Sequence, residues 1–124
     1  MEIKDNLKYT KDHEWVMLDG KVATVGITDF AQSELGDIVY IEVDTVDEEL
    51  NKDEVFGTVE AVKTVSDLFL PMSGKIIEFN ESLNDNPEKV NDSPYGEGWI
   101  IKVEITNPAE LDELLESKTY SEIT

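Results

Sequence analysis

The chain has 124 residues and no cysteine, and its 10 basic and 29 acidic residues give a formal net charge of −19. Such a length fits one domain, which we expect to span residues 1–124. The lack of cysteine excludes disulfide scaffolds, thiol catalysis and zinc–cysteine sites, and a single histidine, His13, excludes a multi-histidine metal site. The negative charge disfavours nucleic-acid binding and favours positively charged partner surfaces.

Targeting signals are missing from the sequence. No stretch approaches the roughly 18 to 20 apolar residues of a membrane span, and the segment Met1–Asp5 has neither signal-peptide nor Arg-rich transit-peptide character. We therefore expect a cytoplasmic protein that does not bind membranes, or a protein of the mitochondrial matrix if the source is eukaryotic. We also expect a monomer.

The first elements are a hairpin and a short helix. Glu14–Leu18 and Lys21–Gly26 flank Asp19-Gly20, which is a strong two-residue hairpin signal. Thr28 then caps a helix over Asp29–Leu35, and a glycine closes it.

A second hairpin follows in the middle of the chain. Ile38–Val43 is typical of a strand, and the acidic segment Asp44–Glu54 indicates an exposed loop. The β-rich runs Val55–Val62 and Val65–Leu70 come next, and the few residues between them place Lys63 at or near a hairpin tip.

The last third predicts two strands, a loop and a final helix. Lys75–Phe79 and Trp99–Ile105 read as strands, while Asn80–Glu97 is rich in Asn, Asp, Pro and Gly and predicts a long ordered loop. Pro108–Glu116 predicts a helix with leucines on one face. We expect a mainly β fold, a flattened barrel or sandwich of short antiparallel strands, with one short helix after the first hairpin and one at the C-terminus.

Lys63 draws attention because a modifying enzyme needs one flexible amine on a rigid support. Acylation of such an amine removes its charge and makes the side chain the root of a long arm. The alternative is a solvated lysine without a role, and the hairpin tip alone favours that alternative.

The residues around Lys63 match the pattern of lipoyl and biotinyl carriers. The matching positions are Gly57, Val59-Glu60, Lys63 and, eleven positions after the lysine, Gly74. Biotin carriers usually flank their lysine with methionines, whereas Val62 and Thr64 flank it here. Lipoate is therefore the favoured cargo.

Motifs along the whole chain resemble the glycine cleavage system H-protein family. The segments that carry the resemblance are Tyr9–Val16, Val25–Gln32, Leu35–Tyr40, Glu60–Asp67 and Asn91–Trp99. This resemblance implies a carrier without catalytic residues, with lipoate joined to Lys63 through an amide. The cofactor would hold the chemistry and the protein would present and protect it.

The family resemblance also implies partners. A pyridoxal-phosphate glycine decarboxylase (P-protein) would load the lipoyl arm with an aminomethyl group. An aminomethyltransferase (T-protein) would pass the carbon to tetrahydrofolate, and a dihydrolipoamide dehydrogenase (L-protein) would reoxidise the arm. A lipoate-attaching enzyme would modify the lysine.

Further site residues follow from the same resemblance. Glu14 and Asp67 would line a cleft for the loaded arm and pair with its ammonium. The alternative is that both are solvated surface acids, and the functional role is favoured for Glu14. Glu60 and Gly74 would help the lipoate-attaching enzyme to recognise the hairpin, and a plain strand position is the alternative for Glu60. We expect a packing or hydrogen-bonding role for His13 and no metal site.

Other functions remain open at this point. A lipoyl domain serving 2-oxoacid dehydrogenases would share the lysine hairpin, but not the His13-Glu14-Trp15 or Tyr95–Trp99 motifs. A relay that passes lipoate to other carriers would use the same lysine. No sequence feature supports an enzyme, since the chain has no cysteine, one histidine and no phosphate-binding glycine loop.

Overall fold

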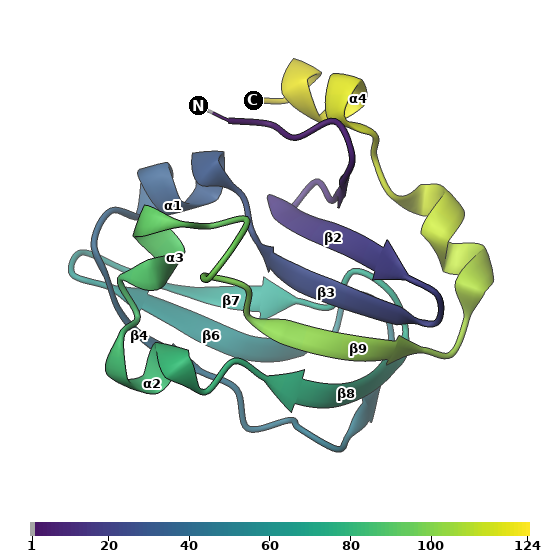
Figure 1. Ribbon diagram of the computed structural model, residues 1–124, viewed down its shortest axis with the longest axis horizontal. Helices are drawn as coiled ribbons and strands as arrows, with labels where there is room; N and C mark the ends of the chain where they lie inside the picture. The colour runs from purple at the N-terminus through teal and green to yellow at the C-terminus, as the bar shows by residue number, and fades with distance from the viewer. Residues whose placement is uncertain (1) are drawn as a thin grey trace.

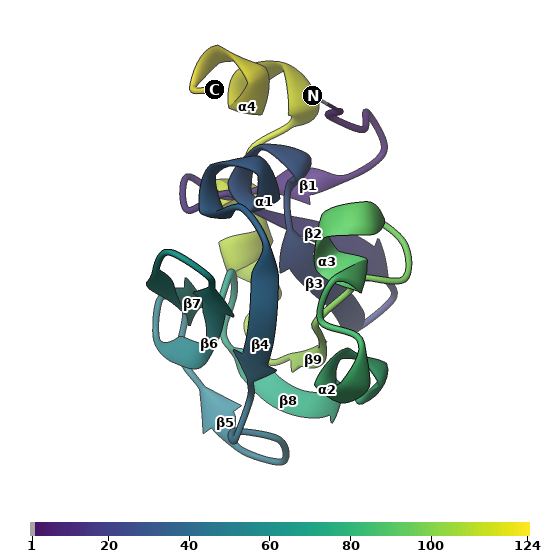
Figure 2. The same cartoon turned by 90° about the vertical axis from the view of Figure 1, so that its left-hand side faces the viewer.

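Two antiparallel sheets face each other in the computed structural model, which describes residues 2–124. The larger sheet has six strands, in the order β1 (Lys8–Tyr9), β2 (Glu14–Asp19), β3 (Val22–Ile27), β9 (Ile101–Ile105), β8 (Gly74–Phe79) and β5 (Glu49–Leu50). The smaller sheet has three, in the order β4 (Ile38–Glu42), β6 (Val55–Ala61) and β7 (Val65–Phe69). Figure 2 shows β6 and β7 of the smaller sheet on one side of the molecule and β2 and β3 of the larger sheet on the other. The predicted mainly β fold is confirmed, as an unclosed sandwich.

The hydrophobic core lies between these sheets. Alternate residues of the facing strands point inward, and Val25, Val59, Ile76 and Val103 are each at most 1% exposed. Full burial of one such side chain stabilises the fold by about 1.5–3 kcal/mol. The core therefore fixes the register of both sheets, because a slip by one residue would turn every inward side chain to solvent.

The first hairpin and its helix form as predicted. Gly20 takes the positive φ of 62° that the turn between β2 and β3 requires. Helix α1 (Asp29–Leu35) begins after Thr28, whose Oγ1 accepts a hydrogen bond from the Ala31 N–H at 3.2 Å. It ends at Gly36, where φ is 80°.

The region predicted as a long loop contains two short helices instead. These are α2 (Ser82–Asp85) and α3 (Lys89–Asp92). Each buries one apolar side chain completely, Leu83 in α2 and Val90 in α3. Because turn-forming residues dominate the composition of this stretch, local propensity does not favour helices here. The burial of Leu83 and Val90 against the core stabilises the helical turns instead.

The C-terminal prediction is wrong in its bounds. A 3-10 helix, η1 (Pro108–Glu113), replaces most of the expected helix, and α4 (Ser117–Glu122) follows it. Between them, Leu115 exchanges two backbone hydrogen bonds with Tyr9 of β1, at 2.8 and 2.7 Å, and this pairing holds the chain extended. The first described residues and α4 lie at the same end of the molecule, at the top of Figure 1.

The helices in residues 2–124 are short, and none combines the length and apolar character that a membrane crossing requires.

Candidate functional site

Lys63 occupies the turn that joins β6 and β7. The Ala61 N–H donates to the Thr64 carbonyl at 2.7 Å and closes the turn, and the Val62 N–H donates to the Asp37 carbonyl at 3.0 Å. Lys63 itself is exposed. The tip is thus held by backbone hydrogen bonds on two sides while it presents a free amine, as the sequence predicted.

The stem of Lys63 lies across the C-terminal end of α1. A Cβ atom placed on Gly36 would be 3.5 Å from the Lys63 Cε and 3.9 Å from its Nζ. Glycine at this position leaves the space beside the lysine open, and its φ of 80° also disfavours any other residue. The end of the lysine side chain therefore lies beside the residue that closes α1.

A cleft of about 290 Å³ lies between α1 and the β6–β7 hairpin. Leu35, the last residue of α1, lines it, and so do Ser66 and Val59 from the hairpin. Lys63 is not part of the lining, and its side chain lies beside Gly36, which follows Leu35 in the sequence. Its apolar walls are made by Ile27, Phe30, Ala31, Leu35, Val59 and Leu68. This space suits a long apolar arm that starts at the lysine.

Glu14 is the buried acid of the cleft. Its side chain is 2% exposed, and its carboxylate accepts hydrogen bonds from the Phe69 N–H at 2.8 Å and the Thr10 hydroxyl at 3.3 Å. Burial raises the pKa of Glu14 to about 8 from its usual 4.5, against the lowering effect of the Phe69 hydrogen bond. Within residues 2–124, no lysine or histidine forms an ion pair with it. A cationic ligand would meet an acid that protein groups have left without a counter-charge.

Asp67 also lines the cleft, but at its exposed rim. It lies on β7, opposite Thr58 of β6. The structure thus brings Glu14 and Asp67, which are far apart in the sequence, to one cavity. Their burial differs strongly, so any charge effect of Asp67 is screened by solvent.

The two residues expected to guide lipoylation occupy different environments. Glu60 is exposed on β6, close to the tip and opposite Val65. Gly74 is buried at the start of β8, where an added Cβ would be 2.5 Å from the Glu104 carbonyl oxygen. The close approach of β9 gives Gly74 a packing reason, and both recognition roles remain predictions.

Asn91 is a site residue that was not singled out from the sequence. Its Nδ2 donates to the Gly36 carbonyl and to the Gln32 Oε1, both at 2.9 Å. Its Oδ1 accepts from the Ile38 N–H at 3.0 Å. These bonds fix the end of α1 beside Lys63. Asn91 belongs to a segment that resembles the family, but its turn-rich surroundings gave no sign of a long-range contact.

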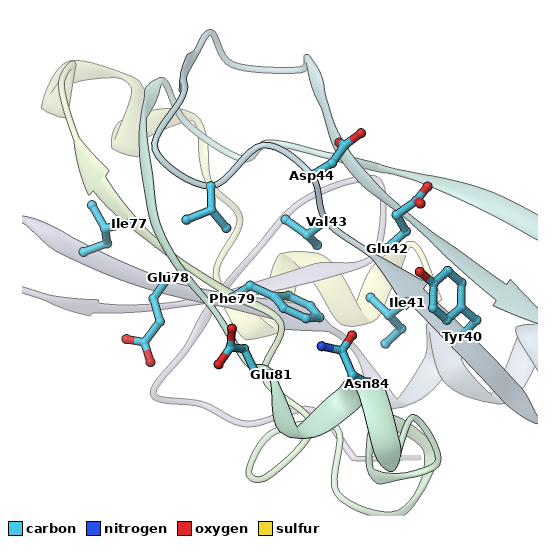
Figure 3. A pocket seen from close by; sticks show the side chains of 11 residues that line it. Tyr40, Ile41, Glu42, Val43, Asp44, Ile77, Glu78, Phe79, Glu81 and Asn84 are labelled. Atoms are coloured by element: carbon cyan, nitrogen blue, oxygen red, sulfur yellow. The ribbon is translucent and has the colours of Figure 1, made fainter.

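A larger groove of about 620 Å³ lies elsewhere, between β4 and β8, and Figure 3 shows its lining. Apolar side chains, including Phe79, form part of its floor. Its acids are all exposed, and they are Glu42, Asp44, Glu78 and Glu81. None of its lining residues belongs to the cleft beside Lys63.

Comparisons with known proteins agree with this geometry. The family model described as glycine cleavage H-protein matches residues 7–124. Two curated relatives named glycine cleavage system H protein come from two strains of Staphylococcus epidermidis. They are 54% and 53% identical over 123 residues, and each match covers 99% of this chain and 98% of the relative.

A solved structure has the same fold. The crystal structure of a glycine cleavage system H protein from Mycobacterium marinum superposes with a TM-score of 0.85, at 36% identity, over 97% of both chains. The chain belongs to the glycine cleavage H-protein family.

Proposed function

We propose that Lys63 carries lipoate through an amide, and that the arm shuttles the aminomethyl group of glycine between the enzymes of the glycine cleavage system. As a glycine cleavage H-protein, the chain is a carrier of that system and not a catalyst. One observation carries the assignment of the site. The exposed Lys63 lies beside Gly36 at the end of α1, and α1 forms one wall of a partly apolar cleft that holds Glu14, a buried carboxyl group without a cationic partner in residues 2–124.

The residues present suit a lipoyl arm. Ile27, Ala31 and Leu35 offer apolar surface along the cleft. When attached, lipoate supplies a disulfide that accepts the aminomethyl carbon and is later regenerated by oxidation. The protein's contribution is to shield that cargo from water.

Glu14 and Asp67 would act on the ammonium of the loaded arm. Glu14 can ionise when a cation arrives, since an opposite charge offsets the burial that raises its pKa to about 8. Asp67 would add a weaker attraction from the rim, because it is exposed. Two further exposed acids, Asp12 and Glu34, line the cleft, so that Glu14 is its one buried acid.

The partners form part of the proposal. They are the P-protein decarboxylase, the T-protein aminomethyltransferase, the L-protein dehydrogenase and a lipoate-attaching enzyme, which would read the hairpin through Glu60 and Gly74. Membership of the glycine cleavage family supports partners from that system. We further propose that residues 1–124 act as a single monomeric domain in the cytoplasm. The bacterial origin of the curated relatives supports this location.

Modification of Lys63 is testable by mass spectrometry. The lipoylated protein is made with a lipoate ligase and analysed by intact mass and peptide mapping, beside Lys63→Arg and a matched control, Lys118→Arg, at another exposed lysine. We expect one adduct, on Lys63, in the wild type and the control, and none in Lys63→Arg. An adduct spread over several lysines, or one that persists in Lys63→Arg, would overturn the proposed site.

A further inference from the structure

The C-terminal helix α4 is attached to the domain by one buried side chain. Tyr120 is 0% exposed, whereas Lys118, Thr119 and Ser121 around it are exposed. Figures 1 and 2 both place α4 at the same end of the molecule as α1. Tyr120 therefore reaches inward from an otherwise solvated helix, toward the region that forms the arm cleft.

The Tyr120 hydroxyl contacts two polar side chains from different elements. It lies 2.7 Å from the Thr28 Oγ1 and 2.8 Å from the His13 Nδ1. Its ring stacks on that of Tyr9, with centroids 4.6 Å apart and planes 8° apart. Burial raises the pKa of Tyr120 to about 12, so the group stays a neutral hydroxyl that can both donate and accept.

Both hydroxyl partners belong to the frame of the cleft. Thr28 caps α1 through the Ala31 N–H, and its own N–H donates to the His13 carbonyl at 3.0 Å. The His13 ring lies against Phe30, with centroids 4.8 Å apart. His13, Phe30 and Ala31 all line the cleft. The hydroxyl thus bridges the segment just before Glu14 and the N-terminal end of α1.

The backbone of His13 needs such support. Its φ is 66°, a left-handed conformation that costs a non-glycine residue free energy and persists only where surrounding contacts hold it. The next residue is Glu14, the buried acid of the cleft. Movement at His13 would shift both a cleft wall and the position of that carboxyl group.

We propose that Tyr120 is a positioning residue for the arm cleft: its hydroxyl holds His13 and the start of α1 together, so that the cleft keeps the loaded arm away from water. This inference rests on the proposed function, because it presumes that the cleft houses the arm. The C-terminal helix is then more than a cap on the fold, since its one buried side chain maintains a cavity formed by other elements.

Tyr120→Phe isolates the hydroxyl, because phenylalanine keeps the stacked ring against Tyr9. Tyr40→Phe is the matched control, since Tyr40 is 45% exposed and lines the remote groove. Two rates are measured on the full-length lipoylated protein. The first is hydrogen exchange of the Ala31 amide, which reports the start of α1 and does not require a loaded arm. The second is ammonia release from the arm after loading by a glycine decarboxylase and glycine, without the aminomethyltransferase.

We expect Tyr120→Phe to be lipoylated like the wild type and to increase both rates by about three- to tenfold, the effect of one lost hydrogen bond. Tyr40→Phe should change neither rate. The inference is overturned if Ala31 exchange is unchanged, or if exchange increases while ammonia release does not, which is the result of a purely structural role. If ammonia release from the wild type already equals that of its unfolded, loaded form, the cleft does not protect the arm. The proposed cleft function then fails, and this inference fails with it.

Discussion

The cleft beside Lys63 and the groove between β4 and β8 differ in size and in chemistry. The groove is the larger, at about 620 Å³ against about 290 Å³, and its acids are all exposed. The smaller cleft holds Glu14, which is 2% exposed and has no cationic partner among residues 2–124. An exposed carboxylate interacts weakly with a cation, because water screens it, whereas a buried one interacts strongly.

Burial of charge therefore identifies the site better than cavity volume does. A protein with 29 acidic residues has acid-lined hollows wherever its surface is concave. Glu14 lines this cleft and also a second cavity, of about 220 Å³, whose lining includes Lys11 and Lys52. The cleft differs from that cavity in having α1 as a wall, and Gly36, which closes α1, lies beside the Lys63 side chain. Substitutions of acids in the cleft and in the groove should separate the effect of a buried acid from that of an exposed one.

The largest effect is expected from Glu14→Gln on the loaded arm. Glutamine keeps an oxygen for the Phe69 N–H but cannot become negative, so the ammonium loses its buried counter-charge. Hydrogen bonds to charged groups contribute about 1.5–3 kcal/mol, and we expect ammonia release without the aminomethyltransferase to be at least tenfold faster. Lipoylation of Lys63 should be unchanged. Equal release rates would assign Glu14 a structural role only.

The stability of the unloaded protein should respond to pH through the same residue. With a folded pKa of about 8 against a usual 4.5, Glu14 keeps its proton in the folded state where the unfolded chain has lost it. The free energy of unfolding should thus fall as pH rises from about 4.5 to 8, by a few kcal/mol relative to Glu14→Gln. Urea denaturation of both proteins at pH 5, 6, 7 and 8 measures this difference. A difference that does not change over that range would contradict a raised pKa.

A smaller effect is expected from Asp67→Asn at the rim of the cleft. Because Asp67 is exposed, its attraction for the ammonium is screened, and ammonia release should rise by no more than about fivefold. The increase should diminish in 1 M salt, whereas the effect of Glu14→Gln should persist because its site is buried. If Asp67→Asn increased ammonia release as much as Glu14→Gln does, burial of the acid would not determine its effect on the arm.

No effect is expected from Glu81→Gln in the remote groove. This residue is exposed and shares no cavity with Lys63 or Glu14. Lipoylation, ammonia release and the pH dependence of unfolding should match those of the wild type. A change in ammonia release would show that charge anywhere on this acidic surface influences the arm, and that the cleft is not special.

Local signals predicted the first hairpin, helix α1 and the lysine hairpin correctly. Asp19-Gly20, Thr28 and Gly36 each act within a few residues, so their geometry follows from the sequence around them. The strands β1 and β5 were missed because each has two residues and exists only through pairing with a distant strand. The bounds of the last helix were wrong because Leu115 pairs with Tyr9, from the opposite end of the chain.

The residues of the candidate site also fall into those that the local sequence predicted and those that it did not. Lys63 and Asp67 follow from the hairpin, whereas only the family resemblance placed Glu14 beside them. Asn91 and Tyr120 could not be identified, because their roles rest on contacts with α1, which is far from both in the sequence. No periodicity or spacing in a single sequence records such contacts.

Glycine-dependent exchange tests the carrier assignment most directly. The protein, lipoylated or unmodified, is mixed with a glycine decarboxylase, glycine and labelled carbon dioxide, and label in the glycine carboxyl group is measured. A parallel assay measures acyl loading by a 2-oxoacid dehydrogenase. We expect exchange with the lipoylated protein, none with the unmodified protein or Lys63→Arg, and poor acyl loading, because partner enzymes recognise the folded surface as well as the arm. Strong acyl loading without glycine-dependent exchange would contradict the glycine cleavage role and leave a lipoyl carrier for other enzymes.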